Sequence, residues 1–327
     1  MASKLFNPFD NFQFDNKTCF LTGKALQTAD EQIQVFPIWM MRKFNLEDMP
    51  FKMLDENIVT YKALKLPCSA NAAILYEQLE SNIENAMATG YLAVKELPEL
   101  SVFQWVAKIL YGVIFNEIQA GIRQATLSGE PLNFSQALVQ KFRNLHFMLQ
   151  SIQTPIEFEH QNPFSILILP IKENDSNFNY RAEINTLVFS FRMNDFAIIA
   201  TLQDNGTNKI YHQDALTKIE GQQLHPIQFE EICARYFYSA YLFNRLPEYT
   251  YMETPEKIFI EPMPLNDWTL KPIFDNWQNK TYGQVLENFW KPWGYTLFEI
   301  IKNPEAPMSF LFDHDNKFIE KVDTAKN

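Results

Sequence analysis

Apolar residues in the second quarter of the chain follow the spacing of helices, after an N-terminal stretch that is irregular and rich in aromatic residues. They recur every three or four positions in three stretches, which predicts amphipathic helices over about 70–89, 101–124 and 135–152. We expect the second helix to begin at Ser101, because a glutamine follows it at the spacing of a capping box. A fourth helix is expected over 226–244, where the same spacing returns.

Beyond residue 160 the apolar residues also form short runs of strand length. These runs lie at 163–170, 186–193, 196–204, 207–212, 257–261 and 308–312. Two turn-forming residues, Asn194 and Asp195, separate the second run from the third and predict a hairpin. Helices together with strands that pair in this way predict an α+β protein with an antiparallel sheet.

Composition indicates a folded chain with a substantial core. The 327 residues are 46% apolar and 20% charged, which excludes disorder as the dominant state. No linker rich in glycine or serine is visible. We therefore expect residues 1–95 to form a subdomain and residues 96–327 to form an α+β body that is continuous with it.

The spacing of glycine and histidine excludes several classes of catalytic site. The nine glycines lie at least eight residues apart, so the chain contains no GxGxxG loop, no Walker A loop and no GxSxG nucleophile elbow. The five histidines are also widely separated, which excludes HExxH and similar local zinc motifs. A site assembled from distant histidines stays open.

The cysteines and the apolar runs indicate a cellular compartment. Three cysteines are too few for a disulfide scaffold. The chain shows no apolar leader of the secretory kind and no apolar run of about 18 residues. We therefore expect a cytoplasmic protein that works in a reducing environment and has no membrane partner.

A net charge of −11 argues against non-specific binding of nucleic acid, because affinity for phosphate backbones depends on clustered lysine and arginine. One local group of basic residues nevertheless offers candidate nucleic-acid contacts. Its members are Arg42, Lys43, Lys52, Lys62 and Lys65. A solvated loop surface is the simpler interpretation of this group.

The segment between residues 19 and 80 carries a motif with candidate chemistry. Cys19 and Cys68 each begin a four-residue pattern, and a Val-Phe-Pro-Ile-Trp stretch lies between them, directly after Gln34. A predicted helix follows the second cysteine. This order resembles the zinc-supported HNH endonuclease-like family over about residues 17–90, a quarter of the chain. The resemblance implies a ββα-type subdomain at the N-terminus.

The motif is degenerate at the positions that would hold zinc or perform catalysis. Thr22 and Asn71 stand where the family has the second cysteine of each pair, and two thiolates with a hydroxyl and an amide bind zinc poorly. Gln34 stands where the family has a metal-adjacent histidine, and an amide cannot take a proton at neutral pH. The resemblance therefore implies no catalytic residue and no cofactor, with zinc disfavoured.

We thus expect a catalytically silent HNH-like protein, retained as a binding module or scaffold for a protein or nucleic-acid partner. This hypothesis predicts that the sulfur atoms of Cys19 and Cys68 lie close together. Residues 105–112 read Trp-x-x-Lys-Ile-x-Tyr-Gly and resemble a helix of longer proteins that contain such modules.

Two other functions stay open. An active metal-dependent nuclease or hydrolase could assemble its site from residues that are distant in sequence. The candidates for that site are Asp204, His212, Asp214 and His225. A plain protein-interaction domain could instead present an aromatic surface. The candidates for that surface are Trp268, Trp277, Trp290 and Trp293, for which packing in the core is the simpler interpretation.

Overall fold

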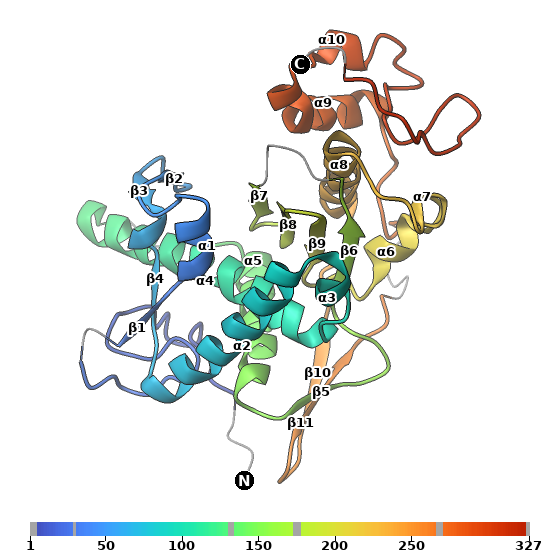
Figure 1. Ribbon diagram of the computed structural model, residues 1–327. Coiled ribbons are helices and arrows are strands. Elements are labelled where there is room, and N and C mark those ends of the chain that lie inside the picture. Colours follow the sequence, from blue (N-terminus) through green and yellow to red (C-terminus); the bar gives the residue numbers. More distant parts are fainter. Residues whose placement is uncertain (1–4, 29–30, 130–133, 173–177, 266–270, 325–327) are drawn as a thin grey trace. The chain divides into compact units, whose positions relative to one another are not determined.

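The computed structural model describes residues 5–28, 31–129, 134–172, 178–265 and 271–324 (Figure 1). It mixes helices with mostly antiparallel sheets, which confirms the α+β prediction. The chain forms two compact units that are each assembled from separate segments. Unit 1 consists of Met1–Thr89, Glu96–Pro163 and Leu246–Met263, and unit 2 consists of Gly90–Lys95, Phe164–Arg245 and Pro264–Asn327.

Unit 1 begins with two paired strands and a helix. β1 (Gln32–Gln34) pairs antiparallel with β4 (Lys65–Pro67), and α2 (Ala70–Thr89) follows directly. The helix predicted over 70–89 is therefore confirmed. Further elements are inserted between the two strands of the pair. They are α1 (Ile38–Lys43), β2 (Pro50–Lys52), β3 (Ile58–Thr60) and the short 3₁₀ turn η1 (Tyr61–Ala63).

The core of unit 1 is built around α4 (Glu99–Ser128), which is buried without a break from Val102 to Phe115. A helix buried on all sides is apolar all round, and this stretch is apolar apart from a glutamine and a lysine. The expected start at Ser101 is wrong, because α4 begins at Glu99, directly after Pro98. A carboxylate in the first turn suits the positive end of the helix dipole.

The remaining elements of unit 1 include a sheet that joins distant parts of the chain. These elements are α5 (Gln136–Leu149), η2 (Gln150–Ile152), β5 (Ile156–Phe158), β10 (Tyr249–Glu253) and β11 (Ile258–Pro262). β11 is the central strand, antiparallel to β10 and parallel to β5. Because of α4, α5 and this sheet, unit 1 extends well beyond residue 95, where we expected the boundary of the first subdomain.

Unit 2 is built on a four-stranded antiparallel sheet with the strand order β6-β9-β8-β7. The strands are β6 (Ser165–Pro170), β7 (Phe178–Glu183), β8 (Val188–Met193) and β9 (Phe196–Thr201). The hairpin predicted at Asn194-Asp195 is confirmed between β8 and β9, and Asn194 has the positive φ of 50° that such turns require. β8 and β9 are buried along their whole length.

Helices pack on this sheet and on one another in unit 2. α8 (Pro226–Leu242) contacts β8 and β9, and α9 (Asn279–Trp290) contacts α8. The helix predicted over 226–244 is confirmed. The shorter helical elements are α3 (Tyr91–Lys95), α6 (Thr207–Tyr211), α7 (Gln213–Ile219), η3 (Lys291–Trp293) and α10 (Leu297–Ile300).

Two strand predictions in unit 2 are wrong. Residues 207–212 form α6 and the residue after it, because the Asp204 carboxylate accepts hydrogen bonds from the backbone N–H groups of Gly206 and Asn208 and so supports the helix start. Residues 308–312 form no strand and contribute an isolated bridge between Phe312 and Phe318. Local side-chain hydrogen bonds outweigh the apolar run in the first case.

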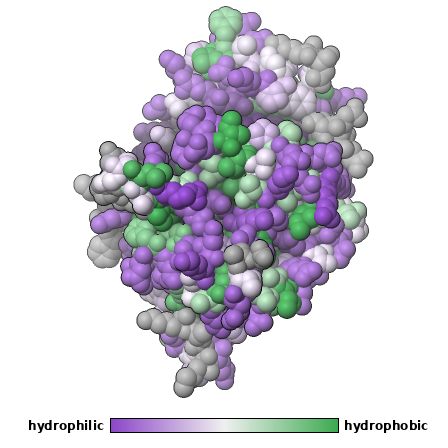
Figure 2. Space-filling view, turned by 90° about the vertical axis from the view of Figure 1, so that its left-hand side faces the viewer, coloured by the Kyte–Doolittle hydropathy of each residue, from purple (hydrophilic) through white to green (hydrophobic). Residues whose placement is uncertain are grey.

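The tryptophan candidates that the structure describes belong to the core of unit 2. Trp290 is fully buried, and Trp277 and Trp293 pack against the same core. Trp268 lies outside the described residues. Figure 2 shows one face of the molecule, on which hydrophobic residues form small patches separated by hydrophilic ones. These observations support the core interpretation of the described tryptophans.

Close packing between α4 and the end of β1 makes a first prediction. A Cβ atom on Gly112 would lie 2.7 Å from both methyl carbons of Val35, which is fully buried. We expect Gly112→Ala to lower the free energy of unfolding by about 1–2 kcal/mol, because overpacking outweighs the higher helix propensity of alanine. Urea denaturation of the full chain measures this change.

The variant Val35→Ala provides the matched control. In that background the two methyl groups are gone, so Gly112→Ala is expected to be neutral or to stabilise by up to about 1 kcal/mol. Equal effects of Gly112→Ala in both backgrounds would contradict the packing argument.

Candidate functional site

Two loops of unit 1 bring the sulfur atoms of Cys19 and Cys68 together. The backbone N–H of Phe20 donates to the carbonyl oxygen of Pro67 at 2.8 Å, and the N–H of Gly23 donates to that of Cys19 at 3.0 Å, which closes a tight turn. Both cysteines are fully buried, their side chains are hydrogen-bonded to each other, and the Cys68 thiol also lies 3.6 Å from the Ser69 carbonyl oxygen. The expected proximity of the two sulfurs is therefore confirmed.

This contact makes one thiol easier and the other harder to ionise. The hydrogen bond between them lowers the pKa of Cys19 despite burial, and the same bond together with burial raises the pKa of Cys68. Thr22 and Ser69 also hydrogen-bond the Cys19 sulfur, whereas Asn71 is exposed in the first turn of α2. Two thiols with hydroxyl groups are a poor donor set for zinc, so the residues present do not fit a structural zinc ion.

Gln34 ends β1, opposite Lys65 of β4. With its amide oriented to satisfy both neighbours, the nitrogen donates to the carbonyl oxygens of Lys62 and Leu64, each at 3.2 Å. The side chain therefore braces the loop that leads into β4. An amide held in this way cannot act as a general base.

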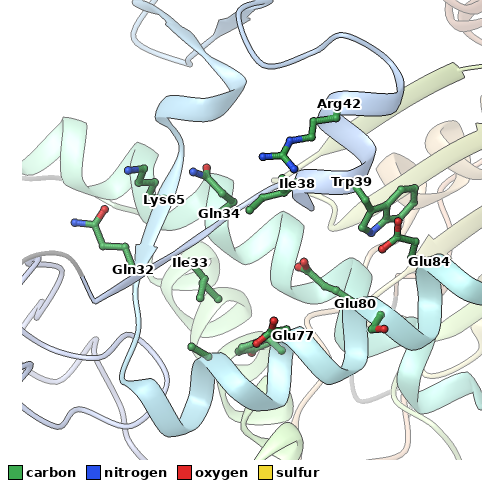
Figure 3. Close-up of a pocket in the computed structure, with 13 residues that line it drawn as sticks. Gln32, Ile33, Gln34, Ile38, Trp39, Arg42, Lys65, Glu77, Glu80 and Glu84 are labelled. Carbon is green, nitrogen blue, oxygen red and sulfur yellow. The ribbon is translucent and has the colours of Figure 1, made fainter.

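A pocket of about 710 Å³ lies between β1, α1 and α2 (Figure 3). Gln34, Lys65, Trp39 and Arg42 line it from the strands and α1. The α2 wall carries three glutamates, whose spacing of three and four residues puts them on one face of the helix. They are Glu77, Glu80 and Glu84. The pocket thus combines an acidic helix face with two cations from other elements.

Two of the three carboxylates are available to a ligand. Glu77 and Glu84 have no ion-pair partner among the described residues. Trp39 also lines the pocket, and its indole N–H has no hydrogen-bond partner in the part of the chain that the structure describes. Carboxylates and an aromatic ring in one pocket suit the ammonium or guanidinium group of a ligand.

The third carboxylate is held by a buried lysine. Lys108 of α4 is 1% exposed, and its ammonium group lies 2.5 Å from the Glu80 carboxylate and 3.0 Å from the Val35 carbonyl oxygen. A buried cation is tolerated when it is both paired and hydrogen-bonded. Lys108 therefore fixes α2 against the residue that follows β1.

A buried histidine supports the loop that carries Cys19. The Nε2 atom of His146 lies 2.7 Å from the Phe20 carbonyl oxygen, and its ring packs against Tyr111 with the centroids 5.0 Å apart. Burial lowers the pKa of His146 to about 4, so the imidazole is neutral at physiological pH. Its role in the structure is to hold the loop.

Local ion pairs neutralise much of the basic group that was a candidate for nucleic-acid contacts. Three of its five members pair with nearby carboxylates, and a fourth, Lys43, lies 5.7 Å from the centre of the Phe44 ring. Lys65, the fifth, lines the pocket. The pairs are Arg42–Glu47 at 3.6 Å, Lys52–Glu56 at 2.6 Å and Lys62–Asp48.

The candidates for a distant catalytic site lie in different local environments of unit 2. Asp204 and His212 belong to a buried polar cluster, in which His212 Nε2 lies 2.9 Å from the Ser239 hydroxyl. Burial lowers the pKa of His212 to about 3 and raises the pKa of Asp204. Asp214 is exposed and pairs with a lysine four residues on, and His225 caps α8.

The sequence pattern gave no role to Lys108, Glu80 or His146. The sequence does contain a sign that Lys108 is paired. It stands within an almost entirely apolar helical run, and a lysine at such a position is rarely buried without a partner. Glu77, Glu80 and Glu84 had the spacing of an ordinary solvated helix face. Only the fold shows that β1 and α1 lie opposite that face.

Comparison of the chain with protein-family models, curated proteins and solved structures found no match. Among the helices of the described residues, none has the length and apolar content that crossing a membrane requires.

The buried ion pair makes a second prediction. We expect Lys108→Met to lower the free energy of unfolding of the full chain by about 3 kcal/mol, because it leaves the Glu80 carboxylate and the Val35 carbonyl without a partner. The double variant Lys108→Met/Glu80→Gln should regain part of this loss, since the unpaired charge is removed. Urea denaturation measures both.

The exposed pair Lys52–Glu56 provides the control, with side chains 63% and 79% exposed. Lys52→Met should change the free energy of unfolding by less than about 1 kcal/mol. A loss of similar size for Lys52→Met and Lys108→Met would show that the buried pair has no special role.

Proposed function

We propose that the N-terminal part of unit 1, up to Thr89, forms a catalytically silent HNH-like module, retained to bind a protein partner through the pocket between β1, α1 and α2. The observation that carries this proposal is the contact between Cys19 and Cys68 where α2 begins. Two loops that are distant in sequence meet there beside the antiparallel pair β1–β4 and the helix α2, with α1, β2, β3 and η1 inserted between the two strands. The resemblance to HNH-like modules predicts that these two cysteines lie close together at the start of the helix.

The loss of nuclease chemistry is supported by the side chains at the pocket. Hydrolysis of a phosphodiester in this family needs a base that activates water and a divalent ion that holds the phosphate. Gln34 cannot act as the base, and its amide is engaged with two backbone carbonyl groups. In the described part of the chain, the group of metal-ligating side chains that converge lies on another sheet, away from this pocket's lining.

Charge favours a protein partner over nucleic acid. A phosphate in the pocket would face the carboxylates of Glu77 and Glu84, which have no ion-pair partner among the described residues, and like charges repel. A protein segment can instead offer a basic side chain to these carboxylates and to Trp39. It can also offer an acidic group to Lys65, and to Arg42 in competition with Glu47.

The proposed origin of the thiol pair makes a third prediction. The double variant Thr22→Cys/Asn71→Cys restores both CxxC patterns, so we expect it to bind one Zn²⁺ or Co²⁺ per chain. Tetrahedral thiolate coordination of Co²⁺ gives intense absorption bands that the unmodified protein should lack. Native mass spectrometry counts the bound zinc.

The matched control is Thr22→Cys/Gln78→Cys, which adds the same number of thiols but places one on an exposed position two turns along α2. It should show no such bands. A folded Thr22→Cys/Asn71→Cys protein that binds metal no better than this control would refute the resemblance.

The acidic pocket makes a fourth prediction. We expect the protein to select peptides with a central lysine or arginine from an array of short peptides, and Glu77→Gln/Glu84→Gln to weaken their binding by about tenfold or more. The reason is the loss of charge-assisted hydrogen bonds to the basic side chain. Fluorescence anisotropy with labelled peptides measures the affinities.

The control Glu253→Gln/Glu256→Gln removes two exposed carboxylates of the same unit that do not line the pocket. It should leave the affinities unchanged. A labelled oligonucleotide is tested in parallel, and binding of this probe with a steep salt dependence, or cleavage of it with Mg²⁺ or Mn²⁺, would overturn the proposal.

A further inference from the structure

Three metal-ligating side chains converge in unit 1 at the ends of neighbouring strands. Glu159 and His160 follow β5 directly, and Glu261 lies in β11. One ligand atom from each of the three residues lies within 4.8 Å of the ligand atoms of the other two. His160 Nε2 lies 3.2 Å from Glu261 Oε1.

The backbone holds these residues in register. β5 runs parallel to β11, with Phe158 opposite Ile260, and the N–H of Glu159 donates to the Ile260 carbonyl oxygen at 3.0 Å. β11 is the central strand of its sheet and is also paired with β10. The convergence therefore rests on main-chain pairing as well as on the rotamers of exposed side chains.

The separation of two of the donor atoms is close to what a small divalent ion requires. In a tetrahedral site with bonds of about 2.0–2.1 Å, two donor atoms lie about 3.3 Å apart. The 3.2 Å between His160 Nε2 and Glu261 Oε1 matches this value. The Glu159 carboxylate, within 4.8 Å of both atoms, offers a third position.

The chemical nature of the three side chains also favours a bound cation. Two of the three side chains are acidic, and a cation bound between them would relieve the repulsion of two nearby carboxylates. One imidazole nitrogen and two carboxylate oxygens form a donor set of intermediate softness. We propose that Glu159, His160 and Glu261 bind a divalent transition-metal ion of the class of Zn²⁺, Co²⁺ or Ni²⁺, with the remaining coordination positions open to water or to a ligand.

Titration of the full chain with Zn²⁺ and Ni²⁺ in an isothermal calorimeter tests this site. We expect one equivalent of ion per chain, and at least about tenfold weaker binding in His160→Asn and in Glu261→Gln. Both residues are substantially exposed, at 76% and 42%, so the variants should fold like the unmodified protein.

Two comparisons make the result specific. His314→Asn removes another exposed histidine and should leave the binding unchanged. Cys19→Ser/Cys68→Ala removes the thiol pair and should also leave it unchanged. Absence of binding, or binding that persists in His160→Asn and Glu261→Gln, overturns the proposal, and loss of binding in the thiol variant would assign the ion to the cysteines instead.

Discussion

The arrangement of the N-terminal strands and helices depends on the contacts of the Lys108 ammonium group with Glu80 and with the Val35 carbonyl oxygen. This group joins the helix α2 through Glu80 to the end of β1 through the Val35 carbonyl oxygen, and it does so from the centre of the buried helix α4. A lysine can occupy such a place only if its partners are positioned to replace water. The positions of three elements are therefore coupled to one side chain.

Residues close to Lys108 in sequence add further contacts between α4 and the N-terminal elements. One helical turn on, Gly112 lets the methyl groups of Val35 approach the α4 backbone, and Tyr111 packs against Phe20 and His146. His146 in turn holds the loop after Cys19. On the proposed resemblance, zinc would once have tied this loop to the start of α2. In this chain, packing from α4 and α5 and a direct contact between thiols hold the same two segments.

Periodicity in the sequence revealed the long helices, because burial on one side leaves a regular trace, as in α2, α5 and α8. It did not reveal α6, whose start depends on the Asp204 carboxylate, nor β7, which lies at the sheet edge and is buried only in part. The pairing of Cys19 with Cys68 could be expected from a motif. The parallel contact of β5 with β11 could not, since it joins segments about 100 residues apart without a local signal.

The charges in the pocket depend on the same ion pair between Lys108 and Glu80. With Glu80 committed to Lys108, the acidic face of α2 keeps two carboxylates with no ion-pair partner among the described residues, and α1 sets Trp39 and Arg42 opposite them. This pocket therefore carries side chains of both signs, the glutamates on α2 and Arg42 and Lys65 on the other elements. Electrostatic complementarity of this kind contributes more to selecting a partner than to raw affinity. The pocket therefore suits a protein segment with both basic and acidic side chains better than a nucleic-acid backbone. The phosphates of such a backbone would be attracted by Arg42 and Lys65 but repelled by the glutamates of α2.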